Sequence, residues 1–421
     1  MGLLRNRYRW VICGLLFCAT AINYIDRQTV SVLKPLLQTD FGWSEVDYGD
    51  IVFVFQSAYA VSYLLFGRLI DRLGARTGYA MAIGLWTVAH MGHALARSVG
   101  GFMLARAALG IGEGGNFPAG LKAVSDWFPR SERALAVGLF NAGANVGAIV
   151  TPLLVPAVTL AWGWRAAFIV TGLFSVVWLL AWLKIYRRPE ETPSLAPEEL
   201  AHIRAEPMET GRPVPWRVLL VKRESWAYIG GRFLIDPAWW MLLFWLPDFF
   251  ARRHNLDLKT FGVPLAVVYI LSDLGSVAGG WLSSALIKRG RSVNAARKTA
   301  MLVSALAVLP IVGATSIDNL WLAVAIVGLA AAGHQSFSCN LYTLPSDLFP
   351  RKAIGSVAGL GGMAGAVGGM LMSKYAGWVL DGFGSYTPIF AVAASGYLLA
   401  LAAIHLLSPH YEPARLPQDT E

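Results

Sequence analysis

The chain has 421 residues, of which 56% are hydrophobic and only 14% are charged, and its mean hydropathy is positive. Soluble domains carry roughly a quarter charged residues, so this composition excludes an ordinary soluble protein. The formal net charge of +9 would suit a nucleic-acid partner, but the way the basic residues are distributed along the chain argues against one.

Apolar stretches that are long enough to cross a hydrocarbon core of ~30 Å recur along the whole sequence. A backbone inside lipid must satisfy its own hydrogen bonds, so we expect each stretch to be a helix. The alternating pattern of membrane β-barrel strands is absent. The sequence therefore predicts an all-α integral membrane protein with twelve transmembrane helices, which are 9–32, 48–69, 77–96, 101–125, 133–158, 163–186, 226–251, 261–287, 297–316, 319–345, 354–378 and 386–408.

Basic residues concentrate in every second connection between these spans. One set of connections holds the groups 5–9, 68–76, 130–133, 187–224, 288–298 and 351–352, whereas the opposite set carries few Lys or Arg residues. This bias places both termini and the long central loop in the cytoplasm. We therefore expect a multi-pass protein of the cell inner membrane with a lipid bilayer as partner, no nucleic acid, and no cleavable signal ahead of the first span.

The long polar stretch 187–224 contains six prolines and clustered charge, which is typical of a linker with one short surface helix near 198–203. It divides the chain into an N-terminal six-helix bundle at 1–186, the cytoplasmic linker, a C-terminal six-helix bundle at 225–408 and a cytoplasmic tail at 409–421. The three cysteines all fall within spans without metal-ligand spacing, so we interpret them as packing residues.

The two bundles repeat one another in sequence. The run S-D-W-F-P-R at 125–130 follows the fourth span, and S-D-L-F-P-R at 346–351 follows the tenth, at an offset of 221 residues. A second pair, 67–76 and the degraded copy 280–291, has an offset near 213. The repeats predict two pseudo-symmetric six-helix bundles, which is the architecture of transporters that bind substrate midway through the membrane. Chance similarity between Gly-rich helices is the alternative.

The loop after the second span carries a recognisable signature. Its residues 67–76 read G-R-L-I-D-R-L-G-A-R, which resembles the loop motif of the major facilitator superfamily at nearly every position. Residues 106–114 resemble the fourth-helix motif of the same family. The resemblance covers essentially the whole chain and implies the major facilitator fold and transport by alternating access.

Further runs resemble the anion:cation symporter branch of that superfamily. They are N-Y-I-D-R at 23–27 and G-E-G-G-N-F-P at 112–118, and the runs 236–240 and 333–343 are similar to those of its hexuronate transporters. The resemblance implies proton-coupled uptake of a small anionic substrate, a sugar acid such as glucuronate or galacturonate. Another organic anion, such as galactonate or glucarate, is the alternative substrate.

Charged residues inside the predicted spans each need a reason, because a charge at the bilayer centre costs ~3 kcal/mol. Asp26 and Arg27 lie about 24 Å into the first helix, and Arg106 lies at a similar level in the fourth, so an ion pair between Asp26 and either arginine is geometrically possible. Glu113 shares a face with Arg106 but lies ~10 Å deeper. We interpret Arg27 and Arg106 as substrate-binding, and Asp26 and Glu113 as proton-coupling. A structural ion-pair network is the alternative.

Other polar and aromatic residues fall at mid-span and are candidates for contacts with a sugar. Hydroxyl, amide, indole and imidazole groups suit this task, although packing between helices explains each of them as well. The substrate-binding candidates are Tyr24, Tyr59, Asn145, Trp239, Trp240, His334, Gln335 and Ser338. Arg232 and Asp236 stand four residues apart and are expected to pair, whereas Asp273 could pair with Arg232, contact substrate or take a proton.

The loop motif carries a separate hypothesis. In the family this loop latches the cytoplasmic side, and the residues that match are Gly67, Asp71, Arg72, Gly74 and Arg76, with Arg130 and Arg133 nearby. A charge cluster that only sets topology is the alternative. No Walker A, HExxH, CxxC or GxSxG motif is present, so we expect neither an enzyme nor ATP as energy source, no cofactor and no metal. The proton is the expected coupling ion, and the expected functional unit is a monomer.

Three other function classes remain open but are disfavoured. A non-transporting sugar-acid sensor would need an added cytoplasmic interaction domain, and the linker and tail are short. An intramembrane enzyme would need a catalytic cluster that faces the cytoplasm. Efflux of amphipathic drugs disagrees with the two membrane arginines, Arg27 and Arg106.

Overall fold

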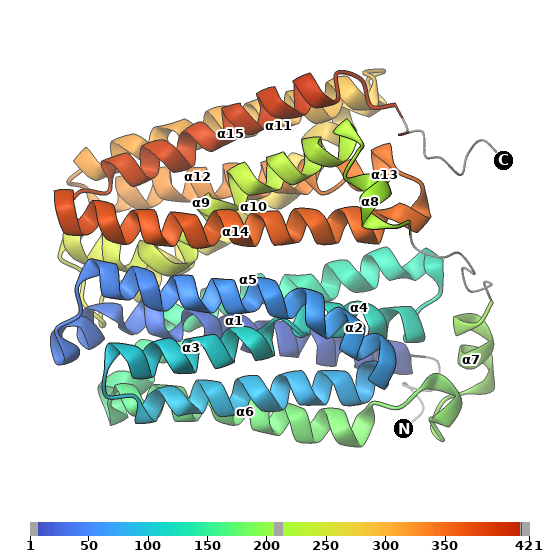
Figure 1. Cartoon of the computed structure of the whole chain (residues 1–421), viewed down its shortest axis with the longest axis horizontal. Helices are drawn as coiled ribbons and strands as arrows, with labels where there is room; N and C mark the ends of the chain where they lie inside the picture. Colours follow the sequence, from blue (N-terminus) through green and yellow to red (C-terminus); the bar gives the residue numbers. More distant parts are fainter. Residues whose placement is uncertain (1–6, 206–213, 413, 415–421) are drawn as a thin grey trace. The chain divides into compact units, whose positions relative to one another are not determined.

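The computed structural model describes residues 7–205, 214–412 and 414, and within these ranges it leaves the side chains of residues 64, 71, 130, 131, 134, 351 and 352 undescribed. The described chain is built from helices, most of which are long and run close to parallel or antiparallel within each half of the sequence, whereas the short helix Pro197–Ile203 runs across this direction (Figure 1). This confirms the all-α fold class.

The N-terminal half contains α1 to α7. Their bounds are α1 Tyr8–Phe41, α2 Glu45–Gly92, η2 His93–Leu95, α3 Val99–Glu113, α4 Asn116–Trp127, α5 Arg130–Trp162, α6 Trp164–Ile185, η3 Pro189–Glu191 and α7 Pro197–Ile203. The C-terminal half contains α8 Trp216–Leu219, α9 Arg223–His254, α10 Gly262–Lys288, α11 Val293–Val308, η4 Leu309–Ser316, α12 Leu320–Leu341, α13 Leu344–Leu348, α14 Arg351–Phe383 and α15 Thr387–Leu407.

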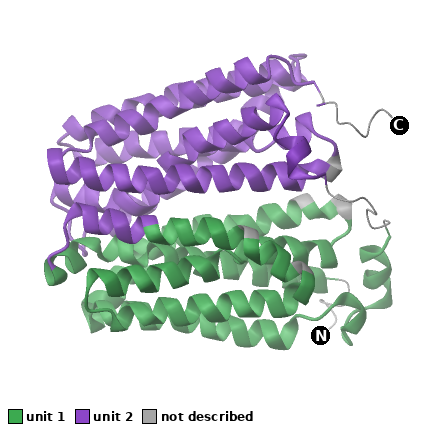
Figure 2. Ribbon diagram, in the orientation of Figure 1, with its two compact units in different colours: residues 1–41, 54–210 green, residues 42–53, 211–421 purple. Residues whose placement is uncertain are grey.

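The chain divides into two compact units (Figure 2). Unit 1 comprises residues 1–41 and 54–210, and unit 2 comprises residues 42–53 and 211–421. The first turns of α2 thus belong with unit 2, where the Tyr48 hydroxyl donates to the Phe244 carbonyl at 2.7 Å. In the same unit Glu45 pairs with Arg252 of α9.

Ten stretches of the described chain are long and apolar enough to cross a membrane. The two other expected spans also correspond to helix. Span 77–96 is the second part of α2 with η2, and span 101–125 is formed by α3 and α4 in succession. The expected twelve spans are therefore all helical, although several begin or end at other residues than the sequence suggested.

Local sequence explains the interruptions in these spans. Gly74 adopts φ 77°, which other residues rarely do, and so separates two helical segments within α2. Gly114 and Gly115 separate α3 from α4. Pro310 lacks a backbone N–H, and there α11 gives way to the 3₁₀ segment η4. Ser98 accepts a hydrogen bond from Gly101 N and caps the start of α3.

The sequence repeat reappears as a repeated packing contact. Within unit 1, Gly147 of α5 lies against the carbonyl of Ala21 in α1; within unit 2, Gly368 of α14 lies against the carbonyl of Phe233 in α9. The glycines are 221 residues apart in the chain and their partners 212, close to the offsets of the two sequence repeats. Neither site has room for a Cβ atom, so both helix pairs depend on glycine for close approach.

Large apolar side chains cover the outside of both units. Val88 and Val177 are exposed in unit 1, as are Val277 and Leu406 in unit 2. In contrast, several charged side chains in the spans are buried, including Asp26, Arg106 and Glu113. This inversion of the usual soluble pattern is that of a protein whose solvent is a bilayer.

Candidate functional site

The centre of unit 1 holds a buried ion pair that joins two helices. Arg27 Nε of α1 donates to Glu113 Oε2 at the end of α3 at 2.8 Å, and Arg27 Nη2 donates to Asn23 Oδ1 at 3.0 Å. The side chains of Arg27 and Glu113 are buried. The second carboxylate oxygen, Glu113 Oε1, accepts no hydrogen bond from the described residues, so the pair leaves one acceptor open in a water-poor setting.

Aromatic rings surround the Arg27 guanidinium. Its carbon lies 4.8 Å from the centre of the Tyr24 ring and 5.0 Å from that of Tyr59. A cation close to the face of a tyrosine ring is attracted by the ring quadrupole. The structure therefore brings together Tyr24, Arg27 and Tyr59, which the sequence nominated separately.

A second guanidinium lies beside the first. Arg106 is fully buried, its Nη2 donates to the Arg27 carbonyl at 2.9 Å, and its guanidinium carbon lies 4.9 Å from the Phe55 ring. The bond to a main-chain carbonyl fixes Arg106 at the level of Arg27 on α1. Two arginines and one glutamate thus converge in one buried cluster, which is a setting suited to an anion.

Glycines of α3 explain how Glu113 reaches Arg27. Gly110 lies against the Phe55 carbonyl and Gly112 lies against the Trp86 backbone, both on α2, without room for a Cβ atom. The close approach of α3 to α2 positions Glu113 in the last turn of α3. The Gly114–Gly115 break that follows ends this helix directly after the carboxylate.

Asp26 lies in a different environment from the one expected. The sequence suggested an ion pair with Arg27 or Arg106, but Asp26 Oδ2 accepts from Ser175 Oγ at 3.0 Å, and its Oδ1 lies 3.2 Å from His90 Nε2. The reason is helical geometry, because consecutive residues on α1 point about 100° apart and Arg27 turns toward Glu113. The expected pairing of Asp26 was therefore wrong.

The sequence analysis missed two polar residues of this region, His90 and Asn23. His90 lies in the predicted span 77–96 and is fully buried, and a titratable residue inside an apolar span is itself a signal. Asn23 lies one helical turn before Arg27 and binds it directly. Both could have been found by treating every polar side chain within a span as a candidate.

Unit 2 holds a second ion pair, which is part-buried and lies within a single helix. Arg232 and Asp236 of α9 are bridged between Nη2 and Oδ2 at 2.6 Å, which confirms the expected pairing. Arg232 Nη1 donates to the Tyr228 hydroxyl at 3.2 Å, and the guanidinium lies 4.5 Å from the Tyr342 ring. The pair is thus framed by tyrosines, as Arg27 is in unit 1.

Next to this pair, an aromatic stack involves two of the nominated residues. The Trp239 ring is stacked on the His334 ring with centroids 5.3 Å apart. His334 Nδ1 is 2.7 Å from the Tyr397 hydroxyl, and Nε2 is 3.3 Å from Ser338 Oγ. Both imidazole nitrogens have a partner, so His334 has the contacts of a hydrogen-bonded, neutral histidine.

The remaining substrate-binding candidates do not join these clusters. Trp240 stacks on Phe244 and packs against Gly369 of α14. Neither Asn145 nor Gln335 has a recorded polar contact within the described part of the chain. The same is true of Asp273 in α10, which is partly buried. The structure therefore gives Asp273 no ionic partner from the residues it describes.

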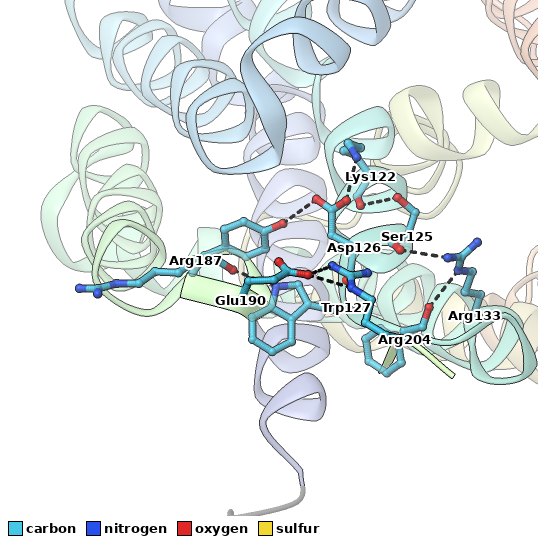
Figure 3. A network of polar contacts seen from close by, with 10 residues as sticks. Lys122, Ser125, Asp126, Trp127, Arg133, Arg187, Glu190 and Arg204 are labelled. Atoms are coloured by element: carbon cyan, nitrogen blue, oxygen red, sulfur yellow. Dashed lines mark hydrogen bonds and ion pairs between the residues drawn. The ribbon is translucent and has the colours of Figure 1, made fainter. Parts of the chain in front are cut away.

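The turn between α4 and α5 in unit 1 holds an extended polar network around the first S-D-W-F-P-R repeat (Figure 3). Asp126 accepts from Lys122 Nζ at 2.7 Å and from the Tyr186 hydroxyl at 3.2 Å. Arg133 donates to the carbonyls of Ser125 and Phe128, both at 3.0 Å. The nominated latch residue Arg133 therefore braces the turn between α4 and α5 within unit 1.

The other latch candidates take separate positions. Arg76 donates to the Leu183 carbonyl of α6 at 2.6 Å, and Arg72 is exposed. Gly74 makes the break in α2 described above, and Gly67 has open space where a Cβ atom would be. The side chains of Asp71 and Arg130 lie outside the described residues.

Comparison with known proteins decides the family. The sequence pattern of the Major Facilitator Superfamily matches residues 16–373. The chain belongs to this superfamily. It is therefore a multi-pass membrane transporter and not an enzyme.

Curated relatives narrow the resemblance. The chain is 33% identical over 420 residues to the hexuronate transporter of Escherichia coli (strain K12), covering 98% of this chain and 96% of the relative. It is 35% identical over 280 residues to the galacturonate transporter of Dickeya chrysanthemi, covering 65% and 81%. It is 29% identical to a D-galactonate transporter of Escherichia coli O6:H1, covering 96% of each.

A solved structure shares the fold. The chain superposes with a TM-score of 0.73 and 18% identity on a bacterial homologue of the human lysosomal transporter Spinster in an inward-facing and occupied conformation. The match covers 96% of this chain and 97% of that one. At this identity the match supports the major facilitator fold and says nothing of substrate.

Proposed function

We propose that this superfamily member is a proton-coupled symporter of a sugar-acid anion, with hexuronates such as glucuronate and galacturonate as substrates. The observation that carries the proposal is the buried cluster of Arg27, Arg106 and Glu113, taken with the names of the relatives. A galactonate transporter also aligns over almost the whole chain, so aldonates are the second candidate substrate class.

The charges of the cluster suit an anionic substrate. With Asp26 and Glu113 ionised, the two carboxylates balance Arg27 and Arg106. Binding one proton to either carboxylate leaves a net positive charge in a low-dielectric region, where an anion is strongly attracted. The carboxylate of a sugar acid then restores neutrality, so one proton and one anion make each other's binding favourable.

Glu113 is the proposed link between proton and substrate. Its Oε2 accepts a hydrogen bond from Arg27 Nε at 2.8 Å. Protonation of Glu113 removes the opposite charge and frees the guanidinium, whose planar donors match a substrate carboxylate in two parallel hydrogen bonds. The same proton therefore neutralises the resident carboxylate and opens the position for the incoming one.

Sugar hydroxyls require donors and acceptors besides the arginines. Tyr24 and Tyr59 flank Arg27 and offer hydroxyl groups next to the proposed carboxylate position. In unit 2, Trp239 and the hydrogen-bonded pair His334 and Ser338 are proposed to contact the sugar, since an indole combines an apolar face with one donor. Asn145, Trp240 and Gln335 stay proposals that rest on the resemblance alone.

The remaining parts of the account are proposals of the same kind. Transport proceeds by alternating access, with the 67–76 loop, Arg130 and Arg133 as a cytoplasmic latch. Both termini lie in the cytoplasm, the membrane is the cell inner membrane, the monomer is the working unit and no cofactor is needed. Basic residues of the 67–76 loop, Arg72 and Arg76, agree with a cytoplasmic location for it.

Uptake into proteoliposomes with an imposed pH gradient tests the proposal. The substrates to compare are glucuronate, galacturonate, galactonate, glucarate and an uncharged hexose. We expect accumulation of one or more hexuronates when the outside is acidic, and none of the hexose. Equal uptake with and without the gradient, or preference for the uncharged sugar, would contradict the proposal.

A further inference from the structure

A buried chain of hydrogen bonds closes on Asp26 from two other helices. Trp86 Nε1 of α2 donates to Ser175 Oγ of α6 at 3.1 Å, and Ser175 donates to Asp26 Oδ2 at 3.0 Å. On the other side His90 Nε2 lies 3.2 Å from Asp26 Oδ1 and 2.7 Å from Thr171 Oγ1. All five side chains are buried. Asp26 is thus bound to α2 and α6 and stands apart from the Arg27–Glu113 pair.

The hydrogen-bond partners of Thr171 assign a tautomer to the His90 imidazole. The Thr171 hydroxyl has a single hydrogen, and it donates this to the Ala167 carbonyl at 2.8 Å. With this assignment Thr171 Oγ1 accepts from His90, which places the hydrogen of the neutral imidazole on Nε2. His90 Nδ1 then carries a lone pair, and it has no hydrogen-bond partner among the described residues.

Asp26 also has an open position. Its Oδ1 accepts no hydrogen bond from the described residues, although His90 Nε2 is only 3.2 Å away. The pair therefore offers two sites for one proton, Asp26 Oδ1 and His90 Nδ1. A buried polar atom without a partner is costly, so neither site is expected to be a packing accident.

We infer that Asp26 and His90 together hold the coupling proton on its way to and from Glu113, which makes His90 a proton-coupling residue of this transporter. A proton from the outer water forms an O–H bond on Asp26 or an N–H bond on His90 and is later returned to inner water, without any change of oxidation state. In the second form the imidazolium forms an ion pair with the Asp26 carboxylate, whose Oδ1 lies 3.2 Å from His90 Nε2.

The surrounding charges bias this pair. Two groups interact electrostatically with His90: Arg106 of α3, and His93 in η2, which lies one turn after His90. Glu113 interacts in the same way with Asp26. From α6 the neighbours of His90 are Thr171 and the Phe168 ring, which carry no charge. Substrate binding at Arg106 would therefore be felt by His90, so proton and anion sites are separate but coupled. This inference rests on the proposed function.

His93 provides a matched control. It is equally buried and one turn from His90, but its Nδ1 lies 2.9 Å from the Ala89 carbonyl and its ring stacks on Phe168 with centroids 5.0 Å apart. No carboxylate is recorded against it within the described ranges. Replacing the His93 imidazole therefore removes a similar volume and one electrostatic neighbour of His90, while every hydrogen-bond contact of the Asp26–His90 pair stays in place.

The transport test compares His90→Gln with His93→Gln in proteoliposomes. Glutamine retains a donor for Thr171 but does not titrate. A one-unit pH gradient supports about tenfold accumulation for each coupled proton. In vesicles with His90→Gln we expect the inner hexuronate concentration to stay near the outer one, while exchange of internal for external substrate persists. In vesicles with His93→Gln we expect the same accumulation as with the unmodified protein. Accumulation by His90→Gln at the unmodified level would overturn the inference.

A second readout separates this inference from the proposed function. Infrared difference spectra between stepped pH values report the protonated carboxyl band of Asp26, assigned by its loss in Asp26→Asn, and need no substrate. We expect His90→Gln to move the titration midpoint of this band and His93→Gln to leave it in place. An unchanged midpoint in His90→Gln overturns the inference even if hexuronate is transported. A moved midpoint supports it even if another anion is the substrate.

Discussion

The arginine–carboxylate pairs Arg27–Glu113 and Arg232–Asp236 differ in how they are built. In unit 1, Arg27 and Glu113 come from α1 and α3, with 85 residues between them in the chain. In unit 2, Arg232 and Asp236 stand one turn apart on α9. Both arginines are framed by tyrosine rings, so the main difference is whether the pair joins two helices or lies within one.

This difference has consequences for movement. A pair within one helix survives any rigid motion of that helix, whereas a pair between helices is broken or formed when the helices shift. The Arg27–Glu113 pair can therefore couple a protonation event to helix position, and Arg232–Asp236 can at most change its rotamers. Unit 1 also holds Arg106 and the Asp26–His90 pair, for which unit 2 has no described counterpart.

The largest expected effect comes from Glu113→Gln. Glutamine cannot bind and release a proton, so substrate binding at Arg27 is no longer linked to protonation, and accumulation under a one-unit pH gradient should fall from about tenfold per coupled proton to near one. Asp236→Asn is the matched change in unit 2, and this variant should still accumulate substrate in response to the pH gradient. Uptake by both variants in the same vesicles measures this, and loss of coupling in Asp236→Asn alone would reverse the assignment of roles.

Paired substitutions sharpen the comparison through stability. Either Arg232→Gln or Asp236→Asn alone leaves one charge unpaired. Because Asp236 is buried and the Arg232 side chain is 18% exposed, the free energy of unfolding should fall by up to about 3 kcal/mol, more in Arg232→Gln than in Asp236→Asn. The double variant removes both charges and should regain most of that loss, with hexuronate exchange retained. Thermal unfolding of the three purified variants measures this effect. A double variant as unstable as the sum of the singles would show that the pair is not the relevant interaction.

The matching double variant in unit 1 is expected to behave differently in function. Arg27→Gln combined with Glu113→Gln should also regain stability, because no unpaired charge is left. It should still fail to transport, because the anion-binding guanidinium and the titrating carboxylate are both lost. Retained uptake of a hexuronate in this double variant would contradict the proposed site.

Another contact that joins separate elements lies at the start of α1 in unit 1. Glu199 of α7 accepts from the backbone N–H groups of Tyr8 and Arg9 at the start of α1, at 3.0 and 3.2 Å. A carboxylate at a helix N-terminus satisfies free donors and the helix dipole. Glu199→Gln should lower stability by about 1 kcal/mol, whereas exposed Glu198→Gln should not. Equal melting temperatures for the two variants would contradict this role of the linker.

The smallest effect concerns Glu132, which also joins elements through Arg9 and His202. The hydrogen bond from Arg9 lowers the pKa of Glu132, and His202 adds to this. A carboxyl group with a lowered pKa contributes stability above its unfolded pKa and loses it as the pH falls through the folded value. Because the Glu132 side chain is still 24% exposed to solvent, which screens the interaction, we expect less than about 1 kcal/mol.

Stability measured against pH tests this contribution. The Glu132→Gln variant should lose part of the decline between neutral and acidic pH that the unmodified protein shows. Exposed Glu191→Gln, for which the described structure records no ion pair, serves as control. An identical pH dependence for Glu132→Gln and the unmodified protein would contradict the contribution.

Much of the fold could be predicted from the sequence, because membrane spans depend on composition over about twenty residues. The duplicated motifs predicted the two bundles, and the distribution of basic residues among the loops predicted the orientation in the membrane. The residues at which the helices begin and end could be predicted less accurately. Hydropathy did not predict the extension of α1 to Phe41 across Pro35, and the 3₁₀ segment after Val308 has Pro310 in its first turn, a local effect that a hydropathy window does not resolve.

The site could be predicted only in part. The Arg232–Asp236 pair could be predicted because the two residues are one turn apart on the same helix. The partners of Asp26 were not, because His90 and Ser175 lie on other helices and their facing depends on tertiary packing. Glu113 and Arg27 were nominated separately, and spacing along a single helix carries no information on which residues from two helices meet.

The most direct test of the central claim reverses the usual experiment. Proteoliposomes with no initial pH gradient are given external glucuronate or galacturonate, and an internal dye records the pH of the lumen. The account predicts that inward movement of the sugar acid acidifies the lumen in the unmodified protein and does not do so with Glu113→Gln. Uptake of the sugar acid by the unmodified protein without any acidification would contradict proton-coupled symport.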